Sequence, residues 1–382
     1  MSEWKKVKLV DICDIRSGKR LPKGTDFSTV PTNYKYIRAR DIKNGIINGE
    51  NLAYITKDVK DKISKYIVNA NDIAITIVGA SVGDVAYVSP EFDGINLTEN
   101  AVRLTNFKDN TNPRFIFYIL NSPEYYLLMQ QIAGGAAQPK MGIYKVEAIE
   151  VCIPSIFDQN RIVDILSRYD SLVENYQKQI KLLEEAAQRL YKEWFVDLRF
   201  PGHENTKIVD GVPEGWEKKR ITDLLEIKYG KDHKKLLDGN IPVYGTGGIM
   251  RYANSSLYTG ESVLIPRKGS LNNIMLVDGT FWTIDTMFFS IPKIENSAKI
   301  AYFYLCEHDM YSMNIGAAVP SMTINILNGM ELLLPTDDLR SQFEKFVGDY
   351  YQLISSLQSQ IRLLTEARDR LLPKLMSGEI EV

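Results

Sequence analysis

The sequence lacks long apolar runs and has few cysteines. The longest apolar candidate, Ile73 to Val78, ends at Gly79, well short of the roughly 18 residues that a membrane helix needs. No apolar segment follows the charged residues at the N-terminus, so we expect no signal peptide and a cytoplasmic location. Three scattered cysteines without CxxC spacing predict neither a disulfide framework nor a thiolate metal site, and we expect them to be buried apolar filler.

Net charge is also nearly absent, with 46 basic against 48 acidic residues in 382. Such a balance does not indicate a nucleic-acid binder by its overall field, so any polyanion must be held by local patches. At about 100 to 200 residues per domain, the length predicts two to four domains.

Several chemical motifs are missing. There is no GxxxxGK[ST] phosphate loop and no Pro-Pro pair, which excludes a recognisable nucleotide motor and the Asn/Asp-Pro-Pro-aromatic signature of amino-methyltransferases. The run Gly245 to Gly248 lacks the spaced third glycine of a dinucleotide site and is interpreted as a tight turn. We therefore predict no catalytic residue, no metal ligand and no cofactor.

The chain contains an internal repeat. Trp4 to Ile12 is echoed 212 residues later by Trp216 to Leu224. Gly135 to Met141 and Val151 to Pro154 are echoed at an offset of 181. The two halves therefore indicate one ancestral unit used twice.

Each half begins with a globular α+β part. Short β-branched runs bounded by Gly, Pro and Asn predict strands, and longer apolar stretches predict helices. The expected strands are Ile73 to Val78, Val85 to Val88, Ser262 to Ile265 and Ile274 to Val277. The expected helices are Arg114 to Ile132, broken near Pro123, and Ala298 to Met313.

A long heptad-patterned helix follows each globular part. Its apolar residues are spaced alternately four and three, and they recur at an offset of 181, with Arg368 as the one departure. Asp158 and the Thr336 to Asp338 cluster are placed as N-caps. The residues predicted to pair the helices are Leu166, Tyr169, Val173, Tyr176, Ile180, Leu183, Leu190, Val347, Tyr350, Ile354, Leu357, Ile361, Leu364 and Leu371.

Two arrangements would bury these stripes. Each stripe could pack on its own globular part, or the two stripes could pack on each other as an antiparallel pair, since the second globular part lies between them in sequence. The fold class we predict is α+β, with two globular domains related by an internal repeat and separated by two long antiparallel coiled-coil helices. The predicted boundaries are 1–154 and 213–335 for the globular domains, 155–200 and 336–382 for the helices, and 201–212 for a linker.

Loops in both globular parts mix basic, amide and aromatic residues, which are the groups that contact phosphates and base edges. A single basic run is usually a solvated face, but its repetition in both halves favours DNA binding. The candidates in the first part are Lys19, Arg20, Lys35, Arg38, Arg40, Lys43, Asn44, Ser81, Gln138 and Lys140. Those in the second are Lys231, Lys234, Lys235, Tyr244, Thr246, Arg251, Arg267, Lys268, Asn272 and Asn273.

Over essentially its whole length the sequence resembles the specificity (S, or HsdS) subunit of type I restriction-modification systems. The likeness rests on the repeat and on local motifs. They are Trp4 with Val7 and Leu9, Tyr36 to Arg38 with Asp41 and Ile42, Gly134 to Met141, Ile153 and Pro154 leading to Gln159 to Ile162, Ile241 to Gly245, and Leu371 to Gly378. One departure is Arg340, which stands where the first half has Gln159 and the family more often has Gln or Glu.

The resemblance implies a DNA-reading subunit without enzymatic activity. The globular parts would be target-recognition domains, each reading one part of a bipartite double-stranded DNA target. The helices would fix the spacer and dock two methyltransferase subunits, and restriction/translocase subunits would then join. Two other hypotheses stay open: a duplicated coiled-coil scaffold that binds only protein, and an enzyme with an unrecognised site.

Overall fold

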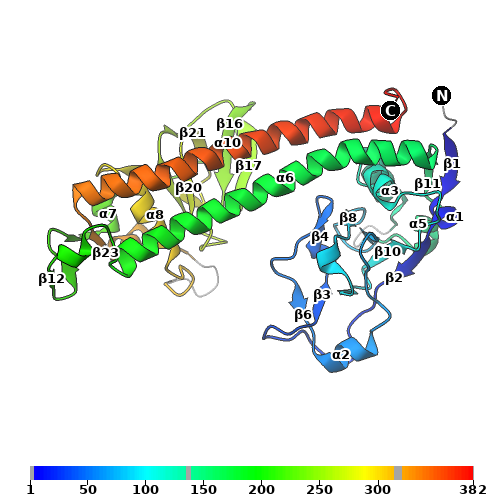
Figure 1. Ribbon diagram of the computed structural model, residues 1–382, viewed down its shortest axis with the longest axis horizontal. Helices are drawn as coiled ribbons and strands as arrows, with labels where there is room; N and C mark the ends of the chain where they lie inside the picture. Colours follow the sequence, from blue (N-terminus) through cyan, green and yellow to red (C-terminus); the bar gives the residue numbers. More distant parts are fainter. Residues whose placement is uncertain (1–3, 135–138, 314–320, 382) are drawn as a thin grey trace. The chain divides into compact units, whose positions relative to one another are not determined.

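A computed structural model describes residues 4–134, 139–313 and 321–381. The chain divides into two compact units (Figure 1). Unit 1 comprises residues Met1–Glu174 and Ile361–Val382, and unit 2 comprises Asn175–Gln360. Each unit therefore contains one globular part and a section of both long helices.

Unit 1 is built on a four-stranded antiparallel sheet in the order β2-β10-β7-β8. Its strands are β2 (Asp14–Ser17), β10 (Ala101–Thr105), β7 (Ile73–Thr76) and β8 (Val85–Tyr87). Smaller sheets pair β1 (Lys5–Lys8) with β11 (Glu150–Ile153), β4 (Ile42–Lys43) with β5 (Ile46–Ile47), and β3 (Lys35–Ile37) with β6 (Ala53–Tyr54) and β9 (Asn96–Leu97). The helices are α1 (Leu9–Ile12), α2 (Lys57–Lys62), α3 (Pro113–Leu120), α4 (Pro123–Ile132) and α5 (Ile143–Glu147).

Unit 2 has a matching four-stranded sheet in the order β15-β22-β19-β20. Its strands are β15 (Leu225–Tyr229), β22 (Met287–Pro292), β19 (Ser262–Pro266) and β20 (Met275–Val277). A second sheet contains β17 (Gly248–Ala253), β16 (Asp238–Gly245), β21 (Thr280–Thr283) and β18 (Tyr258–Thr259), and shorter pairs join β14 (Glu217–Arg220) to β23 (Glu331–Leu334) and β12 (Ile208–Val209) to β13 (Val212–Pro213). The helices are α7 (Ile221–Leu224), α8 (Ala298–Cys306) and α9 (Ile324–Asn328).

The repeat predicted from the sequence is visible in individual bonds. Leu9 N–H donates to the Ile149 carbonyl and Ile221 N–H donates to the Met330 carbonyl, both at 3.0 Å. The Lys6–Glu150 and Lys218–Glu331 ion pairs, both 2.6 Å, join the equivalent strands. These pairs keep the offsets of 212 and 181, so the two units share one folding pattern.

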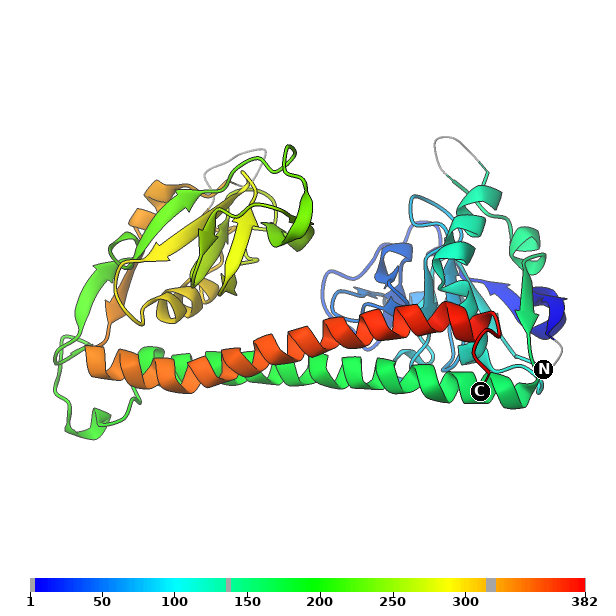
Figure 2. The same cartoon turned by 90° about the horizontal axis from the view of Figure 1, so that it is seen from above.

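Two long helices, α6 (Ile156–Tyr191) and α10 (Asp337–Met376), extend through the units, and a π-helical turn (Lys192–Val196) follows α6. In unit 1 the beginning of α6 lies beside the end of α10. In unit 2 the end of α6 lies beside the beginning of α10 (Figure 2). The two helices are therefore antiparallel, as the sequence predicted.

The apolar seam residues pack in two ways, against the other long helix and against the globular part. None of the fourteen predicted pairing residues is exposed: Leu166, Val347, Ile354 and Leu357 are buried and the others are half-buried. The unit 1 core joins Ile162 and Leu166 of α6 to Leu375 of α10, and it also includes Phe115 of α3. Both arrangements considered for the stripes thus occur together in this unit.

Three local predictions were wrong. Ser155 rather than Asp158 caps α6: its hydroxyl oxygen accepts from the Asp158 N–H at 3.2 Å. The helix expected to continue to Met313 ends at Cys306, because the chain then turns at Asp309, whose carboxylate accepts from the Tyr311 N–H at 3.1 Å. Cys152 is exposed, because it alternates with inward-facing residues along β11.

Candidate nucleic-acid interface

In each unit, a turn with the same backbone hydrogen bond follows an inner strand of the main sheet, β7 in unit 1 and β19 in unit 2. In unit 1, Met141 N–H donates to the Ile77 carbonyl at 2.8 Å, and Gly79 N–H donates to the Pro139 carbonyl at 2.9 Å. In unit 2, Met322 N–H donates to the Arg267 carbonyl at 2.9 Å. A β-bridge accompanies each bond, between Val78 and Lys140 and between Lys268 and Ser321.

These turns gather several predicted residues. Ser81 and Lys140 come together around Gly79, and Lys268 precedes Gly269; both glycines have positive φ values, of 101° and 79°. A left-handed backbone of this kind favours glycine, whose lack of a side chain lets a ligand approach the chain closely. The predicted residue Gln138 lies outside the described residues.

Most of the predicted cations of unit 1 are exposed. Lys19, Lys35, Arg40, Lys43 and Lys140 reach solvent, as does the amide of Asn44. Arg20 is exposed but occupied, because its Nε donates to the Glu99 carboxylate at 2.7 Å. Burial alone would raise the pKa of Glu99, but hydrogen bonds from Arg20 and neighbouring groups hold it below its usual value.

Arg38 is used inside the fold. Its Nε and Nη2 donate to the two carboxylate oxygens of Asp41, each at 2.9 Å, and Nη2 also donates to the Asn51 carbonyl. The Asp41 side chain is only 7% exposed, so this bidentate pair is a structural contact. Arg38 therefore has less capacity for a base or phosphate than the sequence suggested.

The predicted residues of unit 2 also divide into exposed side chains and side chains that are held by contacts within the fold. Lys231, Lys234, Lys235 and Lys268 are exposed. Arg251 is held by Asp238 at 2.6 Å. Arg267 lies over the ring of Tyr229, 4.7 Å from its centroid, and its Nη1 donates to the Asp285 carbonyl.

A hairpin turn brings the remaining unit 2 candidates together. Gly245 pairs with Gly248 across a tight turn, as predicted, and the turn residue Thr246 accepts a 2.7 Å hydrogen bond at its carbonyl from Asn273 Nδ2. Asn272 is occupied, since it donates to Asp309 and accepts from the Met310 N–H. Tyr244 is half-buried on β16, and burial raises the pKa of its phenol, so it stays protonated at neutral pH.

Several exposed apolar residues beside these cations were not predicted. On the edge strand β17, Ile249, Met250 and Tyr252 are 49%, 55% and 46% exposed, next to Arg251. The sequence offered only a weak signal for them, in apolar residues on both sides of Arg251. Side chains of this kind can stack on bases or contact thymine methyl groups.

Other chemistry is limited in the parts of the chain that the structure covers. Within residues 4–134, 139–313 and 321–381, no group of three or more His, Cys, Asp or Glu side chains is placed to hold a metal ion. No helix in those ranges is long and apolar enough to cross a membrane.

The duplicated α+β units with basic loops and paired long helices define a class of two-domain recognition proteins. The sequence matches the family described as type I restriction modification DNA specificity domain over residues 1–185 and again over 213–362. The chain belongs to this family.

Individual relatives are similar over most or all of their length. The chain is 25% identical over 308 residues to the type I restriction enzyme MjaIX specificity subunit of Methanocaldococcus jannaschii, covering 72% of this chain and 71% of that protein. It is 22% identical to the HindI specificity subunit of Haemophilus influenzae, covering the whole of both chains. A crystal structure of the type I restriction-modification S subunit from M. genitalium has the same fold, with a TM-score of 0.58 at 18% identity, covering 98% of this chain and 96% of that one.

Proposed function

We propose that this chain is the DNA specificity subunit of a type I restriction-modification complex. The observation that carries the proposal is that one family domain, described by its role in DNA specificity, occurs twice in a chain whose two units repeat the same sheet order. The subunit itself performs no catalysis; methylation, ATP hydrolysis and cleavage belong to partner subunits. A subunit that reads cellular DNA works in the cytoplasm, and that location is part of the proposal.

The first target-recognition domain (1–154) and the second (213–335) each read one part of a bipartite target. The equivalent glycine turns and exposed lysines in both units support a shared mode of phosphate contact. Lys19 and Lys231 are equivalent at the offset of 212, but other exposed basic side chains differ between the units, with Arg40 and Lys43 in one and Lys234 in the other. Two unlike readers in one chain favour an asymmetric DNA sequence.

Repeated exposed leucines support docking of two methyltransferase subunits on the helices. Unit 1 exposes Leu172 of α6 and Leu363 of α10, by 41% and 56%. Unit 2 exposes their counterparts at the offset of 181, Leu353 and Leu182, by 47% and 64%. A pair of equivalent apolar contacts fits two copies of one partner. Restriction/translocase subunits join the resulting complex.

The test is to determine which bases are methylated in a host that carries the complete system. We expect one two-part sequence with a fixed unread gap. A complex that assembles with its partners but methylates without sequence preference would contradict the proposal and would favour a scaffold that binds only protein.

A further inference from the structure

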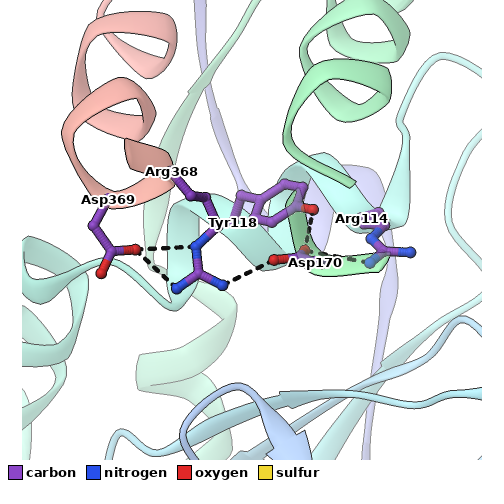
Figure 3. Close-up of polar contacts among 5 residues, drawn as sticks. All are labelled: Arg114, Tyr118, Asp170, Arg368 and Asp369. Carbon is purple, nitrogen blue, oxygen red and sulfur yellow. Dashed lines mark hydrogen bonds and ion pairs between the residues drawn. The ribbon is translucent and has the colours of Figure 1, made fainter. Parts of the chain in front are cut away.

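Asp170 of α6 is the meeting point of three elements of unit 1 (Figure 3). One carboxylate oxygen accepts a 2.8 Å bond from Arg368 Nη1 on α10. The other accepts from Arg114 Nη2 at 3.3 Å and from the Tyr118 hydroxyl, both on α3. The globular part is thereby bonded to both long helices through a single side chain.

These contacts are largely withdrawn from water. The Asp170 side chain is 14% exposed, and those of Arg114 and Arg368 are each 29% exposed. Arg368 also pairs with Asp369 at 2.8 Å, so two guanidinium groups meet two carboxylates and the cluster is neutral. Without Asp170, Arg114 and Arg368 would both lose their acidic partner across the interface.

The hydrogen bonds of Asp170 are directional, whereas the contacts of the apolar seam are not. Apolar contacts are non-directional, so by themselves they specify the relative position of a helix and a packed domain less sharply than directed bonds do. Charge-assisted hydrogen bonds hold their atoms at fixed distances and angles. Arg368 is the seam position at which the second helix departs from the apolar pattern, and its counterpart in the first helix is Ala187.

In unit 2, different residues form the ionic contact between the globular part and the long helices. At the offset of 181, the counterpart of Asp170 is Tyr351, and by the match of Phe117 to Phe303 the counterpart of Arg114 is Ile300. There, Lys299 of α8 donates to Glu344 of α10 at 2.5 Å and also to Glu261. Each globular part therefore has its own ionic attachment to the helices, built from unrelated positions.

We propose that Asp170 is a positioning residue that fixes how the first target-recognition domain sits on the helix pair, and thereby fixes the spacer length that the complex accepts. The inference rests on the proposed function. Asp170 acts through Arg114, Tyr118 and Arg368 rather than through a contact with DNA. If the joint is loosened, the domain can adjust its position, and targets with a neighbouring spacer become acceptable.

The experiment uses the assembled complex with its methyltransferase partners. Methyl transfer is measured on duplexes that carry the target found by methylome sequencing, with the native spacer or with one base pair more or fewer. We expect Asp170→Asn to reduce the preference for the native spacer by about tenfold, the factor that corresponds to one charge-assisted hydrogen bond. Arg368→Gln, which removes the partner on α10, should act in the same direction, and Arg368→Lys should restore part of the preference.

Matched controls on the same helices are Asp164→Asn and Arg370→Gln, both at exposed positions. We expect these two variants to retain the wild-type spacer preference. Spacer preference that is unchanged in both Asp170→Asn and Arg368→Gln, or methylation that falls by the same factor on every spacer, overturns the inference. A wild-type complex without any spacer preference would instead contradict the proposed function.

Discussion

Gln159 and Arg340 stand at equivalent positions of the repeat and make the same bond with different chemistry. Gln159 Nε2 donates to the Pro154 carbonyl at 3.0 Å, and Arg340 Nη1 donates to the Pro335 carbonyl at 2.7 Å. Each acceptor lies five residues before its donor, at the entry to α6 or α10. The arginine that departs from the family pattern therefore preserves the contact that the glutamine makes in the first unit.

Gln159→Ala should destabilise unit 1. The side chain is fully buried, donates to Asn110 as well as Pro154, and accepts from the Asn112 N–H at 2.9 Å. Leaving these backbone groups without a partner should cost about 2 to 4 kcal/mol in the free energy of unfolding. Arg340→Gln should cost less, about 1 kcal/mol, because glutamine can retain the proline contact.

Denaturant unfolding of the purified chain checks both values. Gln177→Ala, at an exposed position of α6, serves as the control and should stay within about 0.5 kcal/mol of wild type. Equal stability of Gln159→Ala and wild type would show that the buried bonds are replaced by water.

Alanine variants of Arg38 and Arg40 should distinguish an arginine that stabilises the fold from one that contacts DNA. Arg38→Ala strands the buried Asp41 carboxylate, and we expect a loss of about 2 to 4 kcal/mol of stability. Arg40 is exposed, so Arg40→Ala should leave stability unchanged. If it contacts a phosphate, the plot of log affinity against log salt for the assembled complex should become less steep by about 0.9.

In unit 2 the exposed Lys231, whose counterpart in unit 1 is Lys19, offers a second test: Lys231→Ala should have the same effect on the salt dependence. Fluorescence anisotropy of labelled target DNA at several salt concentrations gives the slope. If neither variant changes the slope, Arg40 and Lys231 do not belong to the proposed interface.

The sequence predicted the architecture better than the surface, and particular residues show why. The period of the seam depends only on local geometry, so Leu166 and Val347 could be assigned without knowing their partners. The state of a basic side chain depends on distant residues: Arg20 meets Glu99, which lies 79 positions away in the sequence. No spacing rule contains such a contact.

The joint at Asp170 shows the same limit. Arg368 was recognisable as a break in the apolar pattern, but its partner lies 198 residues away and beside the seam rather than on it. Only the register of the two helices identifies it. The exposed leucines were missed for a related reason, since Leu172 and Leu182 fall outside the seam positions that the pattern selects.

The exposed leucines should matter for assembly and not for folding. Leu172→Ser in unit 1 removes a side chain that is 41% exposed, so the loss of stability should be only about 1 kcal/mol. Affinity for one of the two proposed methyltransferase copies should fall at least about tenfold, because an apolar anchor in an interface is typically worth 1 to 2 kcal/mol or more.

Native mass spectrometry of the complex counts the copies bound. Leu172→Ser and Leu353→Ser should each favour a complex with one copy, and the double variant should favour a free subunit. Lys178→Ser, at an exposed polar position of α6, is the control. Full occupancy in the double variant would place the docking surface elsewhere.

Lys299 should contribute a constant amount to the stability of unit 2 over the neutral pH range. Burial alone would lower its pKa, but Glu261 and Glu344 raise it above the usual 10.5, so its contribution is complete below that pH and is lost as the pH rises further. Burial raises the pKa of Glu344 above its ordinary 4.5, and Lys299 opposes that rise. Lys299→Met removes the opposing charge, so the pKa of Glu344 should rise further.

A carboxyl group whose pKa is higher in the folded state binds more protons there, so stability falls as the pH rises from the unfolded value through the folded one. Lys299→Met should therefore be less stable at pH 8 than at pH 5 by about 1 to 3 kcal/mol, since each pKa unit corresponds to about 1.4 kcal/mol. Denaturant unfolding at the two pH values measures the difference. Lys345→Met changes the neighbouring exposed lysine and should show the wild-type dependence; an equal pH dependence in both variants would mean that water already compensates Glu344.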